Sequence, residues 1–419
     1  MIRPCTLLLV ALLSAAPVGA ATLRVSPDGS IAVTIAQAAP GDTVLVTAGR
    51  YQEHLRIEKP LTLRGEGRPM ISGGLKGDVI RVTASDVTIE GFAISDSGDD
   101  LEAQNAGIYL QPGANRAKVR DNVLTNVLFG LWIEKCDSVV IAANTISGKR
   151  DHQSSQRGNG IQLYNTREAQ ILDNRISEVR DGIYVDVSHH ALFRGNEIQK
   201  SRYGTHYMNS YFNTWEYNFV HHNRGGLALM EVRDQVIRHN IAWANEDHGI
   251  MLRTIQRAII EDNVIAGNGR GFFVYDAQDN SLQGNLVVGN QVGVHISAGS
   301  WRNKIDGNDF IGNYEAVRYV GAKDETWGGP LGNHWSGYLG WDRDGDGRGD
   351  IPHLAGDVID RLMWRYPAAR ILLNSPAIET LRVAARQFPV LRAPTVVEQH
   401  PRMRPRFPDW RTWLERARH

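Results

Sequence analysis

The chain has 419 residues, with 46 Lys or Arg and 46 Asp or Glu, and this balance argues against a nucleic-acid-binding protein. Of its two cysteines, Cys5 precedes the expected cleavage site described below, so Cys136 stays alone and no internal disulfide is predicted. Stability must then come from burial and hydrogen bonding, and the length suffices for a large core.

Residues 1–20 have the features of a secretory signal peptide. Arg3 supplies a positive charge, Thr6 to Ala16 form an apolar stretch, and Val18-Gly19-Ala20 is a small-residue cleavage site. The apolar stretch is too short to span a bilayer. We therefore expect a mature chain that begins near Ala21 and works outside the cytoplasm.

The next feature is a repeat. An asparagine recurs with spacings of 22, 30, 22, 22, 22, 23, 22 and 23 residues, at Asn122, Asn144, Asn174, Asn196, Asn218, Asn240, Asn263, Asn285 and Asn308. Eight residues after most of these comes a glycine, at Gly130, Gly182, Gly204, Gly226, Gly271 and Gly293. Apolar residues around these landmarks alternate with period two, which predicts short strands joined by turns.

These coils predict an all-β fold, a right-handed parallel β-helix with coils of about 22 residues over residues 21–340. A helical solenoid would need a different period. The asparagines suit bends because Asn tolerates the left-handed region, and stacked in register they could form an amide ladder. Two polar insertions, Asp96 to Asn105 and Lys149 to Gln156, occupy the same place in their coils and should project from one edge.

In the strand after each glycine, the second and fourth residues should point outward. Near the middle of the stack these positions hold His206, Met208, Met230 and Met251. Thioether and imidazole together suit Cu(I), so these four residues are a candidate copper site. The alternative is an apolar patch that docks a protein partner or the C-terminal tail. Histidines nearer the turns are interpreted individually as solvated turn residues, namely His189, His190, His221, His222, His239 and His248.

Residues 341–353 contain the sharpest local motif. Asp342, Asp344, Asp346 and Asp350 stand at positions 1, 3, 5 and 9 of a calcium-binding loop, with Gly347 at position 6 and the carbonyl of Arg348 at position 7. Position 12 is His353 rather than a bidentate Glu. We predict a structural Ca²⁺ site of modest affinity, with an Asx-rich turn as the alternative.

Beyond the loop the repeat stops. Residues 354–419 show helix-like spacing interrupted by prolines, followed by a Pro- and Arg-rich segment. We predict a short mixed helical and extended C-terminal tail. Such a tail either caps the solenoid or docks on a partner, and we favour partner docking.

The signal peptide, the Asn/Gly repeat, Asn333-His334-Trp335-Ser336-Gly337-Tyr338, the Asp342 to Asp350 run followed by Ile351-Pro352, and the tail with Ser375-Pro376 together resemble the NosD family. Those proteins are periplasmic maturation factors for nitrous oxide reductase. The resemblance implies a non-enzymatic partner of an ABC transporter, composed of a membrane permease and a cytoplasmic ATPase. It also implies that copper comes from a lipoprotein chaperone and goes to the copper–sulfur centre of the reductase, with membrane contact only through partners.

Two other classes remain open. Parallel β-helices often cleave or epimerise acidic polysaccharides, which requires clustered carboxylates near Arg or His. Glu134 and Asp186 share an outward stripe, but Gln162 and Tyr164 intervene, and no row of two or three Asp appears near a basic residue. Asp151-His152, in an insertion loop, is the best alternative acid/base candidate. A passive carbohydrate-binding solenoid would instead stack sugars on an outward stripe of Tyr109, Trp132, Tyr164 and Tyr184.

Overall fold

The structure is a computed structural model that describes residues 19–297, 299–322, 324–355, 366–372, 375–387 and 396–417. Most of the expected signal peptide, residues 1–18, lies outside these ranges. Within them, no helix combines the length and the apolar character needed to cross a membrane.

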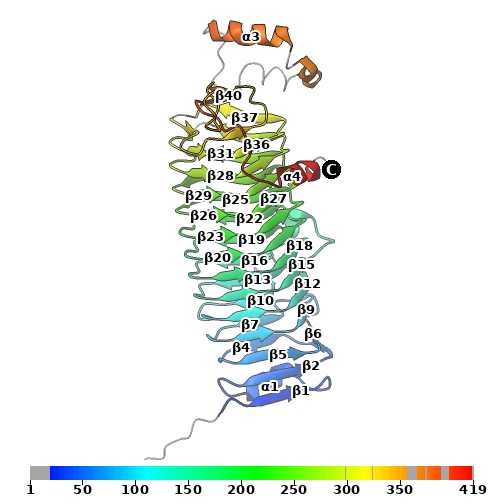
Figure 1. The fold of residues 1–419 in the computed structure, drawn as a ribbon. Helices are drawn as coiled ribbons and strands as arrows, with labels where there is room; N and C mark the ends of the chain where they lie inside the picture. Colours follow the sequence, from blue (N-terminus) through cyan, green and yellow to red (C-terminus); the bar gives the residue numbers. More distant parts are fainter. Residues whose placement is uncertain are drawn as a thin grey trace, which may run out of the picture.

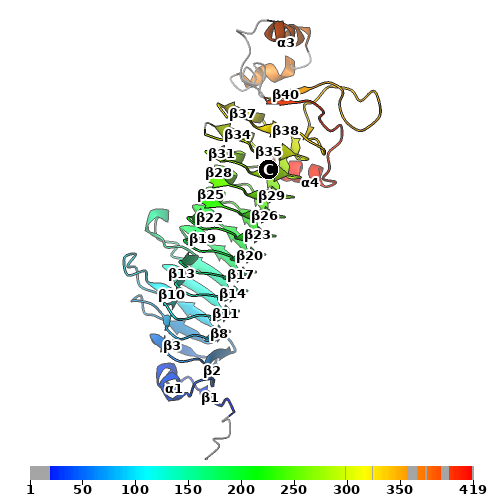
Figure 2. The same ribbon diagram turned by 90° about the vertical axis from the view of Figure 1, so that its left-hand side faces the viewer.

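The described residues form one long stack of coils (Figures 1 and 2), which confirms the predicted parallel β-helix. Three parallel sheets run along the stack. Sheet A contains β1 (Thr22–Val25), β2 (Thr43–Thr47), β5 (Thr62–Glu66), β8 (Thr88–Glu90), β11 (Lys118–Arg120), β14 (Val140–Ala142), β17 (Gln170–Leu172), β20 (Leu192–Arg194), β23 (Thr214–Glu216), β26 (Val236–Arg238), β29 (Ile259–Glu261), β32 (Ser281–Gln283), β35 (Lys304–Asp306) and β38 (Thr326–Trp327).

Sheet B contains β3 (Arg50–Gln52), β6 (Met70–Ser72), β9 (Ala93–Ser95), β12 (Val123–Val127), β15 (Thr145–Gly148), β18 (Arg175–Ser177), β21 (Glu197–Gln199), β24 (Phe219–His221), β27 (Ile241–Trp243), β30 (Val264–Ala266), β33 (Leu286–Val288), β36 (Asp309–Ile311) and β39 (His334–Trp335). Sheet C contains β4 (Leu55–Ile57), β7 (Ile80–Val82), β10 (Ala106–Leu110), β13 (Phe129–Glu134), β16 (Ile161–Tyr164), β19 (Asp181–Asp186), β22 (Tyr203–Met208), β25 (Gly225–Arg233), β28 (His248–Gln256), β31 (Arg270–Tyr275), β34 (Val292–Ser297) and β37 (Glu315–Val320).

Alternation within each strand builds the core. In β19, for example, Ile183 and Val185 point inward and are fully buried, whereas Tyr184 and Asp186 remain partly exposed. The two insertions lie together as predicted, because Lys149 of the second donates to the carbonyl of Ser97 in the first, at 2.8 Å. The second insertion contains the short 3₁₀ helix η1 (Ser154–Gln156). Figure 2 shows these loops projecting from one side of the stack.

Asparagine ladders close the corners of the coil. At the corner between sheets A and B, each side-chain amide donates to the next, as in Asn240 Nδ2 to Asn263 Oδ1 at 3.0 Å. The predicted ladder is thus confirmed, and a second one that was not predicted runs through Asn223, Asn245, Asn268, Asn290 and Asn313 at the corner between sheets B and C.

The ladder asparagines do not themselves adopt the left-handed conformation that was expected of them. The left-handed residue is the one before each ladder asparagine, such as Tyr217 (φ 58°) before Asn218 and His239 (φ 54°) before Asn240. The asparagine amide instead satisfies buried backbone groups, so its value lies in hydrogen bonding rather than backbone tolerance. The repeated glycines serve close packing, since a Cβ at Gly182 would lie 2.5 Å from the carbonyl oxygen of Gly204.

Each end of the stack is capped. At the N-terminal end, α1 (Ile31–Gln37) buries Ile31 and Ile35, and Glu53 accepts the backbone N–H groups of Ile31 and Ala32 at 3.0 and 2.9 Å. At the other end, Glu398 is 1% exposed and ends the first ladder. It accepts the backbone N–H of Asn333 at 2.6 Å and the indole N–H of Trp335 at 2.6 Å.

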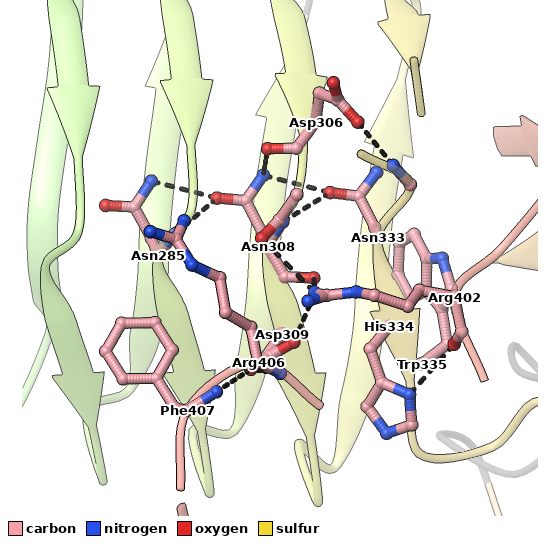
Figure 3. Close-up of polar contacts among 12 residues, drawn as sticks. Asn285, Asp306, Asn308, Asp309, Asn333, His334, Trp335, Arg402, Arg406 and Phe407 are labelled. Atoms are coloured by element: carbon pink, nitrogen blue, oxygen red, sulfur yellow. Dashed lines mark hydrogen bonds and ion pairs between the residues drawn. The ribbon is translucent and has the colours of Figure 1, made fainter. Parts of the chain in front are cut away.

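Glu398 belongs to β41 (Val396–Glu398), which pairs antiparallel with β40 (His353–Ala355). The chain then runs back along the solenoid. Arg402 donates to Asp309 Oδ1 at 2.6 Å, and the backbone N–H groups of Arg406 and Phe407 donate to Asp309 Oδ2 at 2.7 and 2.8 Å (Figure 3). Asp309 is completely buried, so this junction is an internal anchor of the fold.

The chain ends in α4 (Trp410–Arg416), which lies against sheet B. Trp413 is buried there with Ala266, Leu286, Val288 and Ile311. We call residues 396–417 the strap. The prediction treated 354–419 as one partner-docking tail, but the strap is packed on its own solenoid. Residues 366–372 and 375–387, which hold η2 (Pro367–Leu372) and α3 (Pro376–Gln387), instead extend beyond the end of the stack (Figures 1 and 2).

Candidate copper-binding face and calcium loop

The candidate copper residues lie on the outer face of sheet C. The strand register places Tyr184, His206, Ala228, Met251 and Phe273 in successive coils at one position. Met208 follows His206 by two residues on β22 and therefore shares its face, one coil after Asp186. The outward stripe expected from the sequence is therefore present.

His206 is held by Asp181 from the preceding coil and by Arg202 from its own coil. Its Nδ1 lies 3.0 Å from Asp181 Oδ2 and 3.1 Å from Arg202 Nη2, and Arg202 also binds both oxygens of Asp181 at 2.8 and 2.5 Å. Burial alone would raise the pKa of Asp181, but the hydrogen bonds from His206 and Arg202 outweigh it, and the pKa lies below its ordinary value. Asp181 is therefore an anion held beneath the imidazole.

This arrangement decides which ring nitrogen of His206 can bind a metal. When Nδ1–H donates to Asp181, Nε2 keeps its lone pair, and a carboxylate in this position is the usual second partner of a metal-bound histidine. When Nδ1 instead accepts from Arg202, the proton sits on Nε2 and blocks it. The side chains around His206 thus control its ability to act as a ligand.

The methionines are more enclosed than predicted. Met230 and Met251 are 9% and 7% exposed and form a small cluster with Ala228, against which Tyr203 and Phe273 pack. Met208 is half-buried, and the hydroxyl of Tyr184 donates to its Sδ at 3.6 Å. The sulfurs are therefore on the outer face of the sheet, but neighbouring rings cover two of them.

The donor set fits a soft ion in chemistry, with one imidazole and three thioethers on two adjacent strand positions. One neighbour opposes the binding of a cation at Met230, since the positively charged Arg253 places its Nη1 4.0 Å from the Sδ of Met230. Copper bound by His206 and Met208 would leave Arg253 one coil further away. We therefore treat His206 and Met208 as the principal pair and Met230 and Met251 as flanking thioethers.

A cavity of about 580 Å³ adjoins His206 on the same face. Aromatic rings line it together with three carboxylates, Glu134, Asp181 and Asp186, and with Arg180, Arg202 and His206. The expectation that no row of Asp lies near basic residues was wrong, because stacking brings Asp181 against Arg202 and His206, which follow it by 21 and 25 positions in the sequence. Asp151 and His152 do not line this cavity.

Sequence reasoning missed Asp181 and Arg202, which orient His206. Asp181 stands immediately before the repeated glycine Gly182, at a position whose side chain was assigned no role, and Arg202 precedes His206 by four residues. An acidic residue at that coil position next to a histidine one coil later is the signal that could have found them.

The interpretation of the other histidines holds only in part. His189 stacks on Tyr211 and His239 on Tyr217 at the corners, with ring centroids 5.1 and 4.9 Å apart. His221 and His248, however, are 7% and 1% exposed, so they are buried rather than solvated. Outward-facing side chains of a long stack can be covered by their neighbours in the next coil, which a single repeat does not reveal.

The calcium loop brings three of its predicted ligands together. Asp342, Asp344 and Asp346 each offer an oxygen, and these oxygens lie within 4.8 Å of one another. Asp350 is not in this group, since its Oδ2 accepts the backbone N–H of Arg343 at 2.7 Å. The N–H of Arg348 donates to Asp346 Oδ1 at 2.7 Å. Calcium binding itself remains a prediction.

Comparison with known proteins places the chain in a family. A family model described as periplasmic copper-binding protein (NosD) matches residues 142–340, and one of unknown function (DUF1565) matches residues 20–232. A protein of Stutzerimonas stutzeri named probable ABC transporter binding protein NosD is 36% identical over 93% of this chain and 91% of its own. The protein of the same name from Pseudomonas aeruginosa is 39% identical over 92% and 93%. The chain belongs to the NosD family. The resemblance stated from the end motif and tail is thereby confirmed.

Solved structures support the fold alone. The Dettilon tailspike protein (gp208) is 14% identical, with a TM-score of 0.57 over 71% of this chain and 68% of its own. The family 28 exopolygalacturonase of Yersinia enterocolitica is 10% identical, with a TM-score of 0.53 over 70% and 74%. At these identities this chain shares an architecture with them, and no activity follows.

Proposed function

We propose that this protein is a periplasmic, non-enzymatic copper-binding factor that serves maturation of the copper centre of nitrous oxide reductase. In this role it works with an ABC transporter permease and its cytoplasmic ATPase, receives copper from a lipoprotein chaperone and passes it toward the reductase. Family membership supports the transporter and copper association. The observation that carries the proposal is the His206–Met208 pair, oriented by Asp181 on an outer face of the solenoid.

Copper here is a cargo. His206 and Met208 supply imidazole and thioether, which favour Cu(I), and two ligands on one strand leave further positions for a donor or an acceptor protein. Asp181 binds Nδ1 of His206, so Nε2 of the same ring faces away from the Asp181 carboxylate. The enclosed Met230 and Met251 keep the surroundings of low polarity.

The decisive experiment is a Cu(I) titration of the mature chain against a chromophoric chelator. His206→Ala with Met208→Ala should weaken Cu(I) binding at this face at least tenfold. The matched control, His239→Ala with Met70→Ala, removes the same two side-chain types away from sheet C and should leave the affinity unchanged. An unchanged affinity in the first double variant would overturn the site.

The transporter contact is assigned to residues 366–372 and 375–387. Ile371 is 90% exposed and Leu381 is 46% exposed, on a segment that stands clear of the solenoid (Figure 1). Ile371→Asp with Leu381→Asp should abolish co-purification of the chain with the permease and ATPase, whereas Thr380→Asp on the same exposed segment should not. Retained co-purification in the double variant would refute the assignment.

The calcium loop is proposed as a structural site at the end of the stack. Asp342 accepts the backbone N–H groups of Gly345 and Gly347 at 2.7 and 2.9 Å, so the loop is already folded around its carboxylates. Calcium should raise the melting temperature of the mature chain. Asp342→Asn should remove this shift, and Asp28→Asn, an exposed carboxylate at the opposite end, should not. Absence of heat and of a melting shift in the parent chain would exclude the site.

Carbohydrate binding or cleavage is the second candidate, favoured by the cavity that combines aromatic rings with Glu134, Asp181 and Asp186. It predicts new unsaturated or reducing ends when polyuronates are supplied. It also predicts that Trp132→Ala lowers retention on such a polymer. Neither effect is expected for a copper factor.

A further inference from the structure

Two adjacent histidines face each other at the neighbouring face of the coil, where sheet B turns toward sheet C. His221 ends β24 on the outer face of sheet B, and His222 follows it at the corner before Asn223. Their Nδ1 atoms lie only 2.8 Å apart. His221 is buried and His222 is exposed, so the pair opens to solvent on one side.

The surroundings fix both rings. Phe219 stacks on the His221 ring with centroids 4.0 Å apart, and the edge of Trp243 contacts His222 at 4.7 Å. The backbone of His222 is held in the left-handed region at φ 51°, at the same corner position as the other residues that precede ladder asparagines. Little reorganisation is therefore needed to keep the two nitrogens together.

Glu197 completes the arrangement. Its Oε1 lies 3.4 Å from Nε2 of His221. If that nitrogen donates to the carboxylate, the neutral ring has its lone pair on Nδ1, directed at His222. In that case Nδ1–H of His222 donates to Nδ1 of His221. Glu197 then stands where a carboxylate usually binds the second nitrogen of a metal-bound histidine.

The geometry points to a second copper site, in which the Nδ1 atoms of His221 and His222 bind the ion and Glu197 orients His221. Metal–nitrogen distances of about 2.0–2.1 Å place two tetrahedral ligands roughly 3.3 Å apart, so the rings need to separate by about 0.5 Å. The proton of His222 moves from Nδ1 to Nε2, and no proton is released. Because the protein supplies only two ligands, the other coordination positions of the ion stay open. Open positions suit an ion that is held for transfer, whereas a structural ion is fully enclosed by protein ligands.

This site lies on sheet B, whereas His206 and Met208 lie on sheet C, so it does not rest on the site proposed above. Copper is the occupant we infer because imidazole suits it as a ligand and because copper is the proposed cargo of this protein, so the choice of metal rests on the proposed function. Zinc, which also accepts imidazole, is the competitor in the test.

The chain offers a matched control. His189 and His190 are also adjacent, and His190 is likewise exposed in the left-handed region at φ 58°. Their rings stack instead on Tyr211 and Phe212, and Nδ1 of His189 accepts the backbone N–H of Tyr211 at 3.1 Å. This pair has the same sequence and a similar backbone without the facing nitrogens.

The test is a competition titration of the mature chain with Cu(I), and separately with Zn(II), followed by imidazole nitrogen NMR. His222→Ala should remove one copper equivalent or weaken it at least tenfold, and His190→Ala should change nothing. The Nδ1 resonances of His221 and His222 should shift on copper addition. Because His222 is exposed, its variant should melt as the parent does.

Three results would overturn the site. These are an unchanged copper equivalent in His222→Ala, an equal loss in His190→Ala, or tighter binding of Zn(II) than of Cu(I) at this pair. The variant of His206 and Met208 separates the two proposals. If it abolishes the only copper equivalent, the sheet B site is wrong. If it changes nothing while His222→Ala loses copper, the sheet C site is wrong.

Discussion

The outer faces of sheets B and C are built by the same repeat and end up different. Toward the C-terminal end, the outer face of sheet B is covered by the strap, with Trp413 buried against Val288 and Ile311. The outer face of sheet C has no such cover from the described residues and carries the cavity beside His206. One face is closed by the chain itself and the other is available to a ligand.

The closure is prepared by the coil. Gly267, Gly289 and Gly312 occupy, in three successive coils, the corner position that His222 holds two coils before Gly267. A Cβ at Gly289 would lie 2.6 Å from the Cβ of Ala417. Small residues at this corner let α4 approach, whereas His222 lies where the strap no longer reaches. A solenoid can thus assign different roles to equivalent positions by changing one residue per coil.

The largest expected effect comes from opening the closed face. Trp413→Ala removes the buried anchor of α4 and should cost about 3 kcal/mol of strap docking, the range for deleting a buried aromatic ring. Protease cleavage within residues 404–417 should then accelerate on the order of 100-fold. Thr412→Ala, which changes an exposed residue of the same helix, should be cleaved at the same rate as the parent chain. Equal rates in both variants would show that Trp413 does not hold the strap.

The next effect concerns the open face. Asp181→Asn keeps the shape but loses the anion that favours the His206 tautomer with a free Nε2. It should weaken Cu(I) binding at that face by about 10- to 100-fold, as for other second partners of metal-bound histidines. Asp186→Asn, which lines the same cavity without touching the His206 ring, is the control. If both variants bind Cu(I) as the parent does, His206 is not oriented by Asp181 for this purpose.

The smallest effect tests the corner at which sheet C turns into sheet A, between β34 and β35. There Asn303 donates twice to Glu325, at 2.9 and 3.0 Å, and burial raises the pKa of Glu325 to about 7 from its ordinary 4.5. Because the folded pKa is the higher one, this contribution to stability is full below pH 4.5 and is lost as the pH rises to about 7.

Urea unfolding between pH 4.5 and 8 measures this loss. The stability difference between the parent chain and Glu325→Gln should shift in favour of the variant as the pH rises, and then level off above pH 7. Asp28→Asn, which removes an exposed carboxylate at the opposite end of the solenoid, should show no such trend. A difference that stays constant with pH would mean that Glu325 titrates normally in the folded chain.

The sequence by itself determined the parallel β-helix, the amide ladder at one corner, the pairing of the two insertions and, through its end motif, the family. Those features depend on period and spacing, because residues at equivalent positions of a repeat must stack in register. Tertiary structure alone decided that Asp181 binds His206, that Met230 and Met251 are covered, and that the Nδ1 atoms of His221 and His222 face each other. It also decided that Glu398 of the strap binds Asn333 and Trp335, and that Asp309 binds Arg402, Arg406 and Phe407. Most of these contacts join residues of different coils or of distant parts of the chain. The direction of the two adjacent histidines also depends on rings of neighbouring coils, which the repeat of a single coil does not reveal.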